Sequence, residues 1–421
     1  MSKKITISIL TLISILLIFF LNIDNIRVYL RANLPPVVKI KFKELVLGKQ
    51  YLGEVEYYRK LNYNQKVFPV TQFEKLEVKK IKLSDIETLD QTHYGKLKKI
   101  KSNKYRFFLD TYKNDLIIVT VAGSVKIVKN NDFSVIKNIN STLKDLNNIQ
   151  VFDIKTINNY LYVSLDVSKQ EKDCKYFSLY RAKINDEKLN FEKFFDPEKC
   201  IKNNYGGRIS YGEINNNTGI ILSTGATEDE AIKAQDETSH LGKILFFDEN
   251  NSQPKIISRG HRNPQGLFVE GSLILSTEHG PYGGDEINKI SVGKNYGWPI
   301  SSYGDNYNFD IGNQKYTYKK SHKDNGFTEP IYTFVPSIGI SEIIKIPNEF
   351  SKYWTNNYFV GSLNAGRLYR IKFDENFNRV IFSEKITLLD RIRDITYINK
   401  INSFALAMED HGEIWLLKSS N

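Results

Sequence analysis

The sequence lacks the local patterns that mark several large enzyme classes. It contains no Gly-x-Ser-x-Gly nucleophile elbow and no phosphate-binding glycine loop, which argues against α/β-hydrolases and P-loop nucleotide enzymes. Helical periodicity is absent outside the N-terminal segment. Lysine and arginine number 59 against 48 acidic residues, for a net charge of +11, but the basic residues are scattered and form no basic helix. A nucleic-acid partner is therefore not indicated.

Cysteine is also scarce, with two residues in 421. Cys174 and Cys200 flank a candidate hairpin made of residues 176–184 and 189–195, so a disulfide could link its ends. The alternative is a pair of free buried thiols. No histidine stands at ligand spacing to either cysteine, which argues against a metal pair.

The N-terminus carries an uncharged run long enough to cross a bilayer. It extends from Ile5 to Ile23 and follows Lys3 and Lys4. No small-x-small cleavage site comes directly after it, which favours an uncleaved anchor over residues 1–25 rather than a signal peptide. We therefore expect an inner-membrane anchor with the remaining chain in the periplasm or another extracytoplasmic space. Residues 26–98 carry no motif and are expected to form a stalk or N-terminal extension.

The rest of the chain repeats one pattern, in which an apolar strand, a polar turn and a second strand occur six times. The six units are residues 116–128, 160–184, 220–247, 273–290, 358–371 and 404–417. Each is typical of the middle hairpin of a propeller blade. The sequence therefore predicts an all-β protein, with a six-bladed β-propeller over residues 99–421.

Residues 259–299 form an unusual stretch that is rich in glycine, proline, histidine and acidic residues. It contains the segments Gly-His-Arg-Asn-Pro-Gln-Gly-Leu (260–267), Glu-His-Gly-Pro (278–281), Gly-Asp-Glu-Ile-Asn (284–288) and Asn-Tyr-Gly-Trp-Pro (295–299). One such cluster is typical of a tight structural turn. Several clusters with different polar groups indicate a site where backbone and charged groups approach a ligand.

In order and spacing, these segments resemble the quinoprotein glucose/sorbosone dehydrogenase family, and in particular its soluble aldose sugar dehydrogenases. The resemblance implies a six-bladed propeller that oxidises an aldose sugar with pyrroloquinoline quinone (PQQ) and calcium. The expected partner is therefore a small-molecule sugar.

The resemblance also implies roles for individual residues. Arg262 matches the arginine that polarises the quinone carbonyl receiving hydride; its alternative role is a structural salt bridge. The backbone carbonyls of Gly280 and Pro281 match the calcium ligands, and His279 matches a cofactor-contacting position. The alternative is that His279 forms a transition-metal cluster with Glu278, Asp285 and Glu286.

Two further segments complete the expected cofactor site. Arg391 and Arg393 match a pair that binds the carboxylates of the quinone, and their i, i+2 spacing places both on one face of a strand. The long loop between the fourth and fifth hairpins is expected to wall the site. Ser337, in this loop, is a further candidate for cofactor binding.

Two positions depart from the family pattern. Asn204 stands where the resemblance places the histidine general base, so it occupies a catalytic position without being able to accept a proton. Asn364 stands where some relatives have a cofactor-contacting lysine. The sequence therefore leaves two functions open, a quinoprotein dehydrogenase and a non-catalytic propeller that binds a sugar, an anion or a protein partner.

Overall fold

The computed structural model describes residues 75–94, 99–129, 133–146, 148–169, 174–185, 187–196, 201, 205–249, 251–305 and 317–419. The predicted anchor (1–25), Cys200 and Asn204 lie outside these residues. In the described part of the chain, no helix has the length and apolarity needed to cross a bilayer. The larger of two compact units comprises Glu74–His93 and Lys101–Asn421 and is described below.

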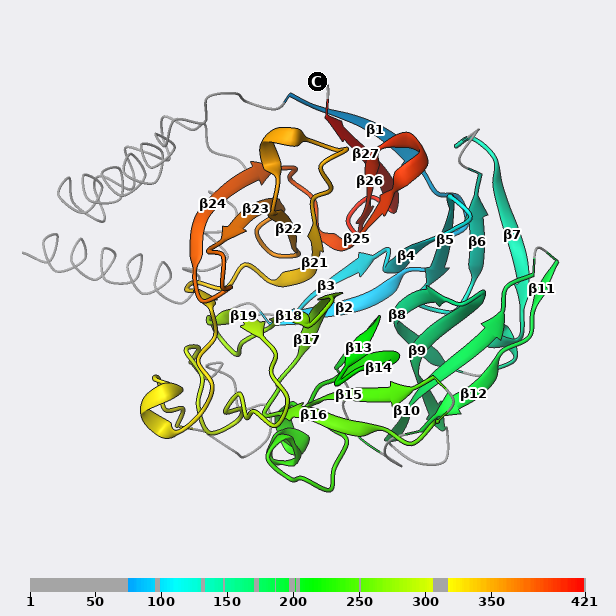
Figure 1. Ribbon diagram of the computed structural model, residues 1–421. Helices are drawn as coiled ribbons and strands as arrows, with labels where there is room; N and C mark the ends of the chain where they lie inside the picture. The colour runs from blue at the N-terminus through cyan, green and yellow to red at the C-terminus, as the bar shows by residue number, and fades with distance from the viewer. Residues whose placement is uncertain are drawn as a thin grey trace, which may run out of the picture. The chain divides into compact units, whose positions relative to one another are not determined.

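This unit contains six β-sheets arranged around a common centre (Figure 1). Blade 1 consists of β4 (Phe107–Tyr112), β5 (Asp115–Thr120), β6 (Val125–Val128), β7 (Ile136–Ser141) and β11 (Lys188–Leu189). Blade 2 consists of β8 (Ile149–Ile157), β9 (Tyr160–Lys169), β10 (Cys174–Lys183) and β12 (Glu192–Phe195). Blade 3 consists of β13 (Gly206–Ile214), β14 (Asn217–Thr224), β15 (Lys243–Asp248) and β16 (Lys255–Arg259).

The other three sheets have the same strand order from the centre outward. Blade 4 consists of β17 (Pro264–Glu270), β18 (Leu273–Glu278), β19 (Asp285–Lys289) and β20 (Tyr332–Phe334). Blade 5 consists of β21 (Ile340–Lys345), β22 (Asn357–Ser362), β23 (Arg367–Phe373) and β24 (Val380–Thr387). Blade 6 consists of β25 (Ile392–Ile398), β26 (Ser403–Met408), β27 (Glu413–Ser419) and β1 (Leu76–Lys82). The six predicted hairpins are the middle strand pairs of these blades, so the six-bladed all-β fold is confirmed.

The remaining described elements are short. Strands β2 (Leu89–Tyr94) and β3 (Lys99–Lys104) pair as a separate two-stranded sheet. The helical turns are all 3-10 helices: η1 (Thr142–Asp145), η2 (Glu228–Ala234), η3 (Lys323–Asn325), η4 (Lys352–Trp354) and η5 (Asn399–Ile401). The absence of α-helix from the described residues agrees with the lack of helical periodicity in the sequence.

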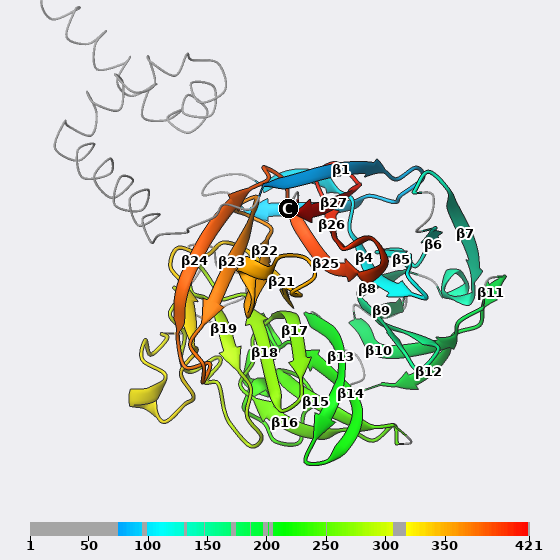
Figure 2. The same ribbon diagram turned by 45° about the horizontal axis from the view of Figure 1, so that its top comes forward.

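The outermost strand of blade 6 comes from the other end of the chain. β1 pairs antiparallel with β27 over its whole length, from Leu76 opposite Ser419 to Lys82 opposite Glu413, and lies outside β27 (Figure 2). These residues belong to the segment 26–98, which was expected to form a stalk or N-terminal extension. Their pairing joins the beginning and the end of the propeller in one sheet, which closes the ring.

Apolar side chains fill the spaces between neighbouring blades. Ile118 of blade 1 packs in one cluster with Ala405 of blade 6, and Val119 packs in another with Val163 of blade 2. Further clusters occupy the other four interfaces between blades. The middle strands are therefore covered on both faces, which explains why they read as continuous apolar runs rather than as strict alternation.

The structure also bears on the cysteine prediction. Cys174 is disulfide-bonded, and no described cysteine is free. Next to it, Lys175 and Ile201 exchange backbone hydrogen bonds of 2.7 and 2.9 Å. Strands β10 and β12 pair antiparallel, as the predicted hairpin requires. The alternative of a free buried thiol is therefore wrong for Cys174.

The innermost strands surround a buried cluster of charges. Nη1 of Arg208, on β13, lies 3.0 Å from a carboxylate oxygen of Asp153, 3.0 Å from one of Glu342 and 2.8 Å from one of Asp394. One guanidinium charge thus faces three carboxylates. Burial, with repulsion from Asp394, raises the pKa of Glu342 to about 7 although Arg208 opposes the rise. The pKa of Asp153 is raised as well, first by burial.

Because of this cluster, we expect the free energy of unfolding to fall as pH rises. A carboxyl whose pKa is higher in the folded state than in the unfolded chain favours folding below the unfolded pKa, near 4.5 for Glu342, and loses that contribution as pH passes about 7. Replacing Glu342 by glutamine removes the titration. Between pH 5 and 8, we expect the unfolding free energy of the parent to fall by about 2–3 kcal/mol more than that of Glu342→Gln.

Urea unfolding at both pH values measures this difference. Glu384→Gln provides the matched control, because Glu384 also pairs with an arginine, Arg370, but on the outer strands of blade 5. Equal pH dependence in the parent and in Glu342→Gln would show that Glu342 is ionised throughout.

Candidate functional site

The sequence motifs meet at one rim of the propeller. Arg262 lies just before β17, Ser337 shortly before β21 and Arg391 immediately before β25. Residues 279–281 begin the turn between β18 and β19. Because β17 and β18 are antiparallel, with Pro264 opposite Glu278, the start of one strand lies beside the end of the other.

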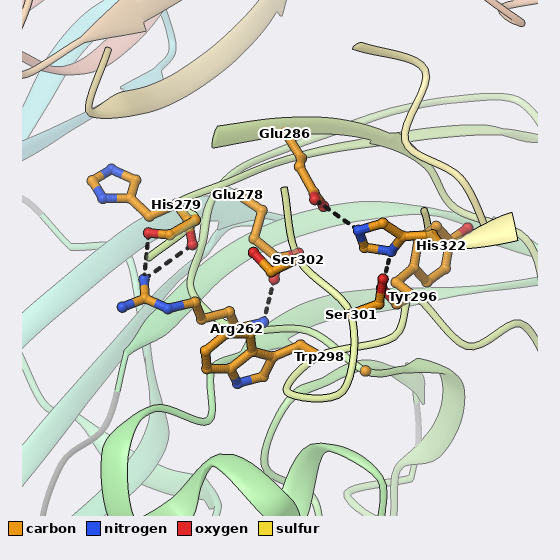
Figure 3. Close-up of a pocket in the computed structure, with 11 residues that line it drawn as sticks. Arg262, Glu278, His279, Glu286, Tyr296, Trp298, Ser301, Ser302 and His322 are labelled. Carbon is orange, nitrogen blue, oxygen red and sulfur yellow. Dashed lines mark hydrogen bonds and ion pairs between the residues drawn. The ribbon is translucent and has the colours of Figure 1, made fainter. Parts of the chain in front are cut away.

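Arg262 is held by neutral groups (Figure 3). Its Nη1 donates to the carbonyl oxygens of His279 (3.1 Å) and Gly280 (2.8 Å), and its guanidinium carbon lies 5.2 Å from the centre of the Trp298 ring. Its Nε is buried and has no hydrogen-bond partner among the described residues. No described carboxylate forms an ion pair with Arg262, so the structure does not favour the salt-bridge alternative, and the guanidinium charge is available to an oxygen of a ligand.

A buried carboxylate fixes the backbone of this arginine. Glu278 accepts a hydrogen bond from the Arg262 backbone N–H with one oxygen and lies 3.1 Å from Nδ1 of His261 with the other. Nε2 of His261 is 2.8 Å from the Ser258 hydroxyl, and the ring stacks on Tyr296 at 4.8 Å. These roles of Glu278 and His261 were not predicted; their only signal in the sequence is that both residues stand in the motif segments.

His279 is positioned as a neutral ring. Its Nε2 donates to the carbonyl oxygen of Ile340, which leaves Nδ1 as an acceptor. Burial lowers the pKa of His279; Asp285 opposes this shift, whereas the charges of Arg393 and Arg262 reinforce it. His279, Arg262 and Arg393 are thus close enough to interact electrostatically, and this brings together three of the predicted site residues.

Asp285 connects the 279–281 turn to blade 5. Its two carboxylate oxygens accept hydrogen bonds from the backbone N–H of Gly280 (3.2 Å) and from those of Ile338 and Ile340 (both 3.0 Å). The neighbouring Ser337 hydroxyl is buried and has no hydrogen-bond partner in the described part of the chain. A buried hydroxyl of this kind is suited to meet a polar atom of a ligand.

The predicted calcium ligands are engaged differently. The Gly280 carbonyl oxygen accepts a hydrogen bond from Arg262, whereas no described group donates to the Pro281 carbonyl oxygen. Among the described residues, no group of three or more His, Cys, Asp or Glu side chains could hold a metal ion, so they do not form the alternative transition-metal cluster. A cation on these carbonyls would have to displace or share the Arg262 contact.

Arg391 and Arg393 converge on a carboxylate that the sequence analysis did not identify. Their Nε atoms lie 3.0 and 2.6 Å from the two oxygens of Glu409, so both side chains contact the same carboxylate. Nε of Arg106 lies 3.1 Å from the same carboxylate. Arg393 also donates to the Gln265 side chain at 2.8 Å, which links this cluster to the motif around Arg262.

Two cavities adjoin these groups. One of about 10 Å³, close to the space that one water molecule needs, is lined by residues of the Arg262 motif and of the long loop, including Trp298 and His322 (Figure 3). His322 Nε2 lies 3.3 Å from Glu286, so the loop does wall this part of the site. The other cavity, of about 330 Å³, is lined in part by Arg391 and Asn364.

Comparison with known proteins identifies the family. The family model for glucose/sorbosone dehydrogenases matches residues 102–416, which is most of the propeller. The chain belongs to the glucose/sorbosone dehydrogenase family. The structural match of the six blades and the convergence of the motif residues on one rim are consistent with this assignment.

Individual members of the family share limited sequence identity with this chain. The aldose sugar dehydrogenase YliI of Escherichia coli is 27% identical over 258 residues, which are 57% of this chain and 66% of that protein. Quinoprotein glucose dehydrogenase B of Acinetobacter calcoaceticus is 31% identical over 162 residues, which are 35% of this chain and 31% of that protein. The chain thus spans less than two thirds of the length of these relatives.

A solved structure shares the fold. The PQQ-bound form of the aldose sugar dehydrogenase from Streptomyces coelicolor superposes with a TM-score of 0.55 at 17% identity, over 82% of this chain and 98% of that one. At this identity, the match supports the propeller fold alone.

The rim fits a polyanionic quinone. Three guanidiniums face the single carboxylate of Glu409, so these four groups carry two positive charges in excess. The buried Ser337 hydroxyl and the buried Nε of Arg262 each lack a described hydrogen-bond partner. PQQ carries three carboxylates and two quinone carbonyl oxygens, which are the groups that such donors bind.

Proposed function

We propose that this protein is a PQQ-dependent aldose dehydrogenase that removes a hydride from the C1 hydroxyl carbon of a sugar. The observation that carries the proposal is the gathering of Arg262, His279 and the Arg391/Arg393 pair on one rim of a glucose/sorbosone dehydrogenase propeller. When bound, the quinone supplies the hydride acceptor. Relatives named as sugar dehydrogenases favour this function over the non-catalytic alternative.

In this proposal, Arg262 stabilises negative charge on a cofactor oxygen. Its two carbonyl partners orient the guanidinium without neutralising it, and Glu278 fixes the backbone from which it extends. Pre-oriented donors of this kind stabilise the transition state because they need no rearrangement during the reaction. His279, kept neutral by burial, offers Nδ1 as an acceptor to a donor group of the cofactor.

Calcium belongs to the same proposal. The carbonyl oxygens of Gly280 and Pro281 are hard ligands that suit calcium, but Arg262 occupies one lone pair of the Gly280 oxygen. A divalent cation and a guanidinium that contact the same carbonyl oxygen repel each other. Calcium binding is therefore expected to weaken or displace the hydrogen bond from Arg262 to the Gly280 carbonyl oxygen.

The lack of a general base at position 204 is expected to limit the rate of sugar oxidation. An amide at position 204 can orient the sugar hydroxyl but cannot remove its proton. Hydride loss without a positioned base leaves proton transfer to water, which is slower by the factor that general-base catalysis normally supplies. The proposed enzyme is thus expected to turn over slowly.

Location is a separate part of the proposal. The uncharged run Ile5–Ile23 supports a membrane anchor, and the disulfide at Cys174 fits an oxidising compartment such as the periplasm. Protease treatment of intact spheroplasts should digest the propeller if it is outside the inner membrane. Protection until the cells are lysed would place it in the cytoplasm.

The function is tested by reconstitution. Purified protein is incubated with PQQ and calcium, and the reduction of an artificial dye is followed with a panel of aldoses. We expect dye reduction that requires both PQQ and an aldose and that falls after calcium chelation. Binding of PQQ without any sugar-dependent reduction, even after prolonged incubation, would favour the non-catalytic alternative.

A further inference from the structure

The Glu409 carboxylate gathers arginines from two blades. Arg391 and Arg393 belong to the start of blade 6, whereas Arg106 immediately precedes the innermost strand of blade 1. The backbone supports the arrangement, because the Tyr105 N–H donates to the Glu409 carbonyl oxygen at 2.9 Å. Arg106 is thus fixed beside the predicted cofactor pair by both side-chain and backbone contacts.

The innermost strands of blades 1 and 6 are also linked by a hydrogen bond close to this cluster. The Leu109 N–H donates to a carboxylate oxygen of Asp394 at 2.7 Å, and these residues follow Arg106 and Arg391, respectively, by three positions. The innermost strands β25 and β4 are in contact along the ring. Arg106 therefore lies at the same level of the rim as Arg391.

The cluster holds more positive charge than its own carboxylate neutralises. Burial alone would raise the pKa of Glu409, but Arg393, Arg106 and Arg391 together hold it well below its usual range. Burial lowers the pKa of Arg393 to about 9, and repulsion from Arg106 and Arg391 adds to this effect although Glu409 opposes it. Such a cluster is stabilised when an anion binds to it.

Other acids nearby have their own side-chain partners. Asp410 pairs with Lys104, and Asp390 accepts a 2.6 Å hydrogen bond from His411. The side chain of Arg106 contacts Glu409 through Nε, and its terminal amino groups donate no hydrogen bond to any described residue. These terminal groups are thus available to a ligand.

We propose that Arg106 is a third arginine of the quinone site, which binds a carboxylate of PQQ together with Arg391 and Arg393. This inference rests on the proposed function. It accounts for the asparagine at position 364, where some relatives have a cofactor-contacting lysine, because Arg106 of blade 1 supplies a positive charge in place of that lysine. Glu409 acts as the positioning residue, since it contacts all three guanidiniums through their Nε atoms. Nη1 of Arg391 also donates to the Leu363 carbonyl oxygen, and Nη1 of Arg393 donates to the Gln265 side chain.

The test is the affinity of the purified apoprotein for PQQ, measured by quenching of tryptophan fluorescence with calcium present. Loss of one charge-assisted pair predicts that Arg106→Gln binds PQQ about 10-fold or more weakly than the parent, with a smaller loss for Arg106→Lys. Arg391→Ala serves as the comparison within the predicted pair. Arg181→Gln is the matched control, because Arg181 also pairs through Nε with a glutamate but on the third strand of blade 2.

The outcomes separate the two proposals. Weaker binding in Arg106→Gln, with an unchanged melting temperature and normal affinity in Arg181→Gln, supports the assignment. Affinity equal to the parent in Arg106→Gln while Arg391→Ala binds weakly would overturn the role of Arg106 and leave the proposed function intact. Absence of PQQ binding in the parent would overturn both.

Discussion

Replacement of Arg262 by glutamine is expected to lower kcat for aldose oxidation by about 10²–10³, the usual cost of removing one donor that stabilises developing negative charge. The side chain is held by two neutral carbonyl oxygens and by the face of Trp298. Folding should be little affected, because no described carboxylate is left without its ion-pair partner. Steady-state dye reduction with saturating PQQ measures the loss.

Arg259→Gln is the matched control for this variant. Arg259 lies three residues earlier and pairs with Glu237, whose side chain is 73% exposed, so its loss should leave kcat close to that of the parent. Arg262→Lys retains the charge without the planar fork and should recover only part of the activity. A kcat for Arg262→Gln equal to that of the parent would show that Arg262 only links the 279–281 turn to its neighbours.

Replacement of Asn204 by histidine is expected to raise aldose oxidation by one or more orders of magnitude, within the ~10²–10⁴ range of general-base catalysis. The resemblance places this position where the base stands, and an amide cannot take the proton of the sugar hydroxyl. The gain should increase as pH rises through the imidazole pKa, near 6.5, because only the neutral ring accepts a proton. Dye reduction between pH 5 and 9 compares the parent with the variant.

Asn203→His is the control for this gain, since it adds the same ring one position away. A gain in Asn204→His alone supports the assignment of the base. No gain with PQQ demonstrably bound would mean that another group already serves as base or that the site does not admit a sugar. A fully active parent would show that the alignment of Asn204 with the base is wrong.

The fold was largely predictable because its signal is local. Each middle hairpin carries its own apolar strands and polar turn, so six repeats could be counted without knowing how they pack. β1 could not be recognised in this way. It pairs with β27, more than 300 positions later, and its exposed outer position gives only the weak pattern Leu-Glu-Val-Lys-Lys-Ile-Lys.

The site was predictable only where the motifs are contiguous. Arg391 and Arg393 both contact Glu409, as expected from their position in one motif, although Arg391 precedes β25 and the register of that strand shifts between Ile392 and Asp394. Arg106 and Glu409 stand in no motif, and their contact joins blades at opposite ends of the chain. The hydrogen bond from Arg262 to Gly280 was also missed, since the sequence does not show which backbone oxygens a side chain will reach.

Anaerobic mixing of the PQQ-loaded protein with an aldose tests the central claim most directly, because the absorbance of the bound cofactor reports its reduction without any dye. The account predicts that the oxidised quinone spectrum disappears slowly in the parent, faster in Asn204→His and hardly at all in Arg262→Gln, with a rate that depends on the aldose concentration. A quinone that is stably bound yet remains oxidised with every aldose, in the parent and in Asn204→His alike, would contradict it.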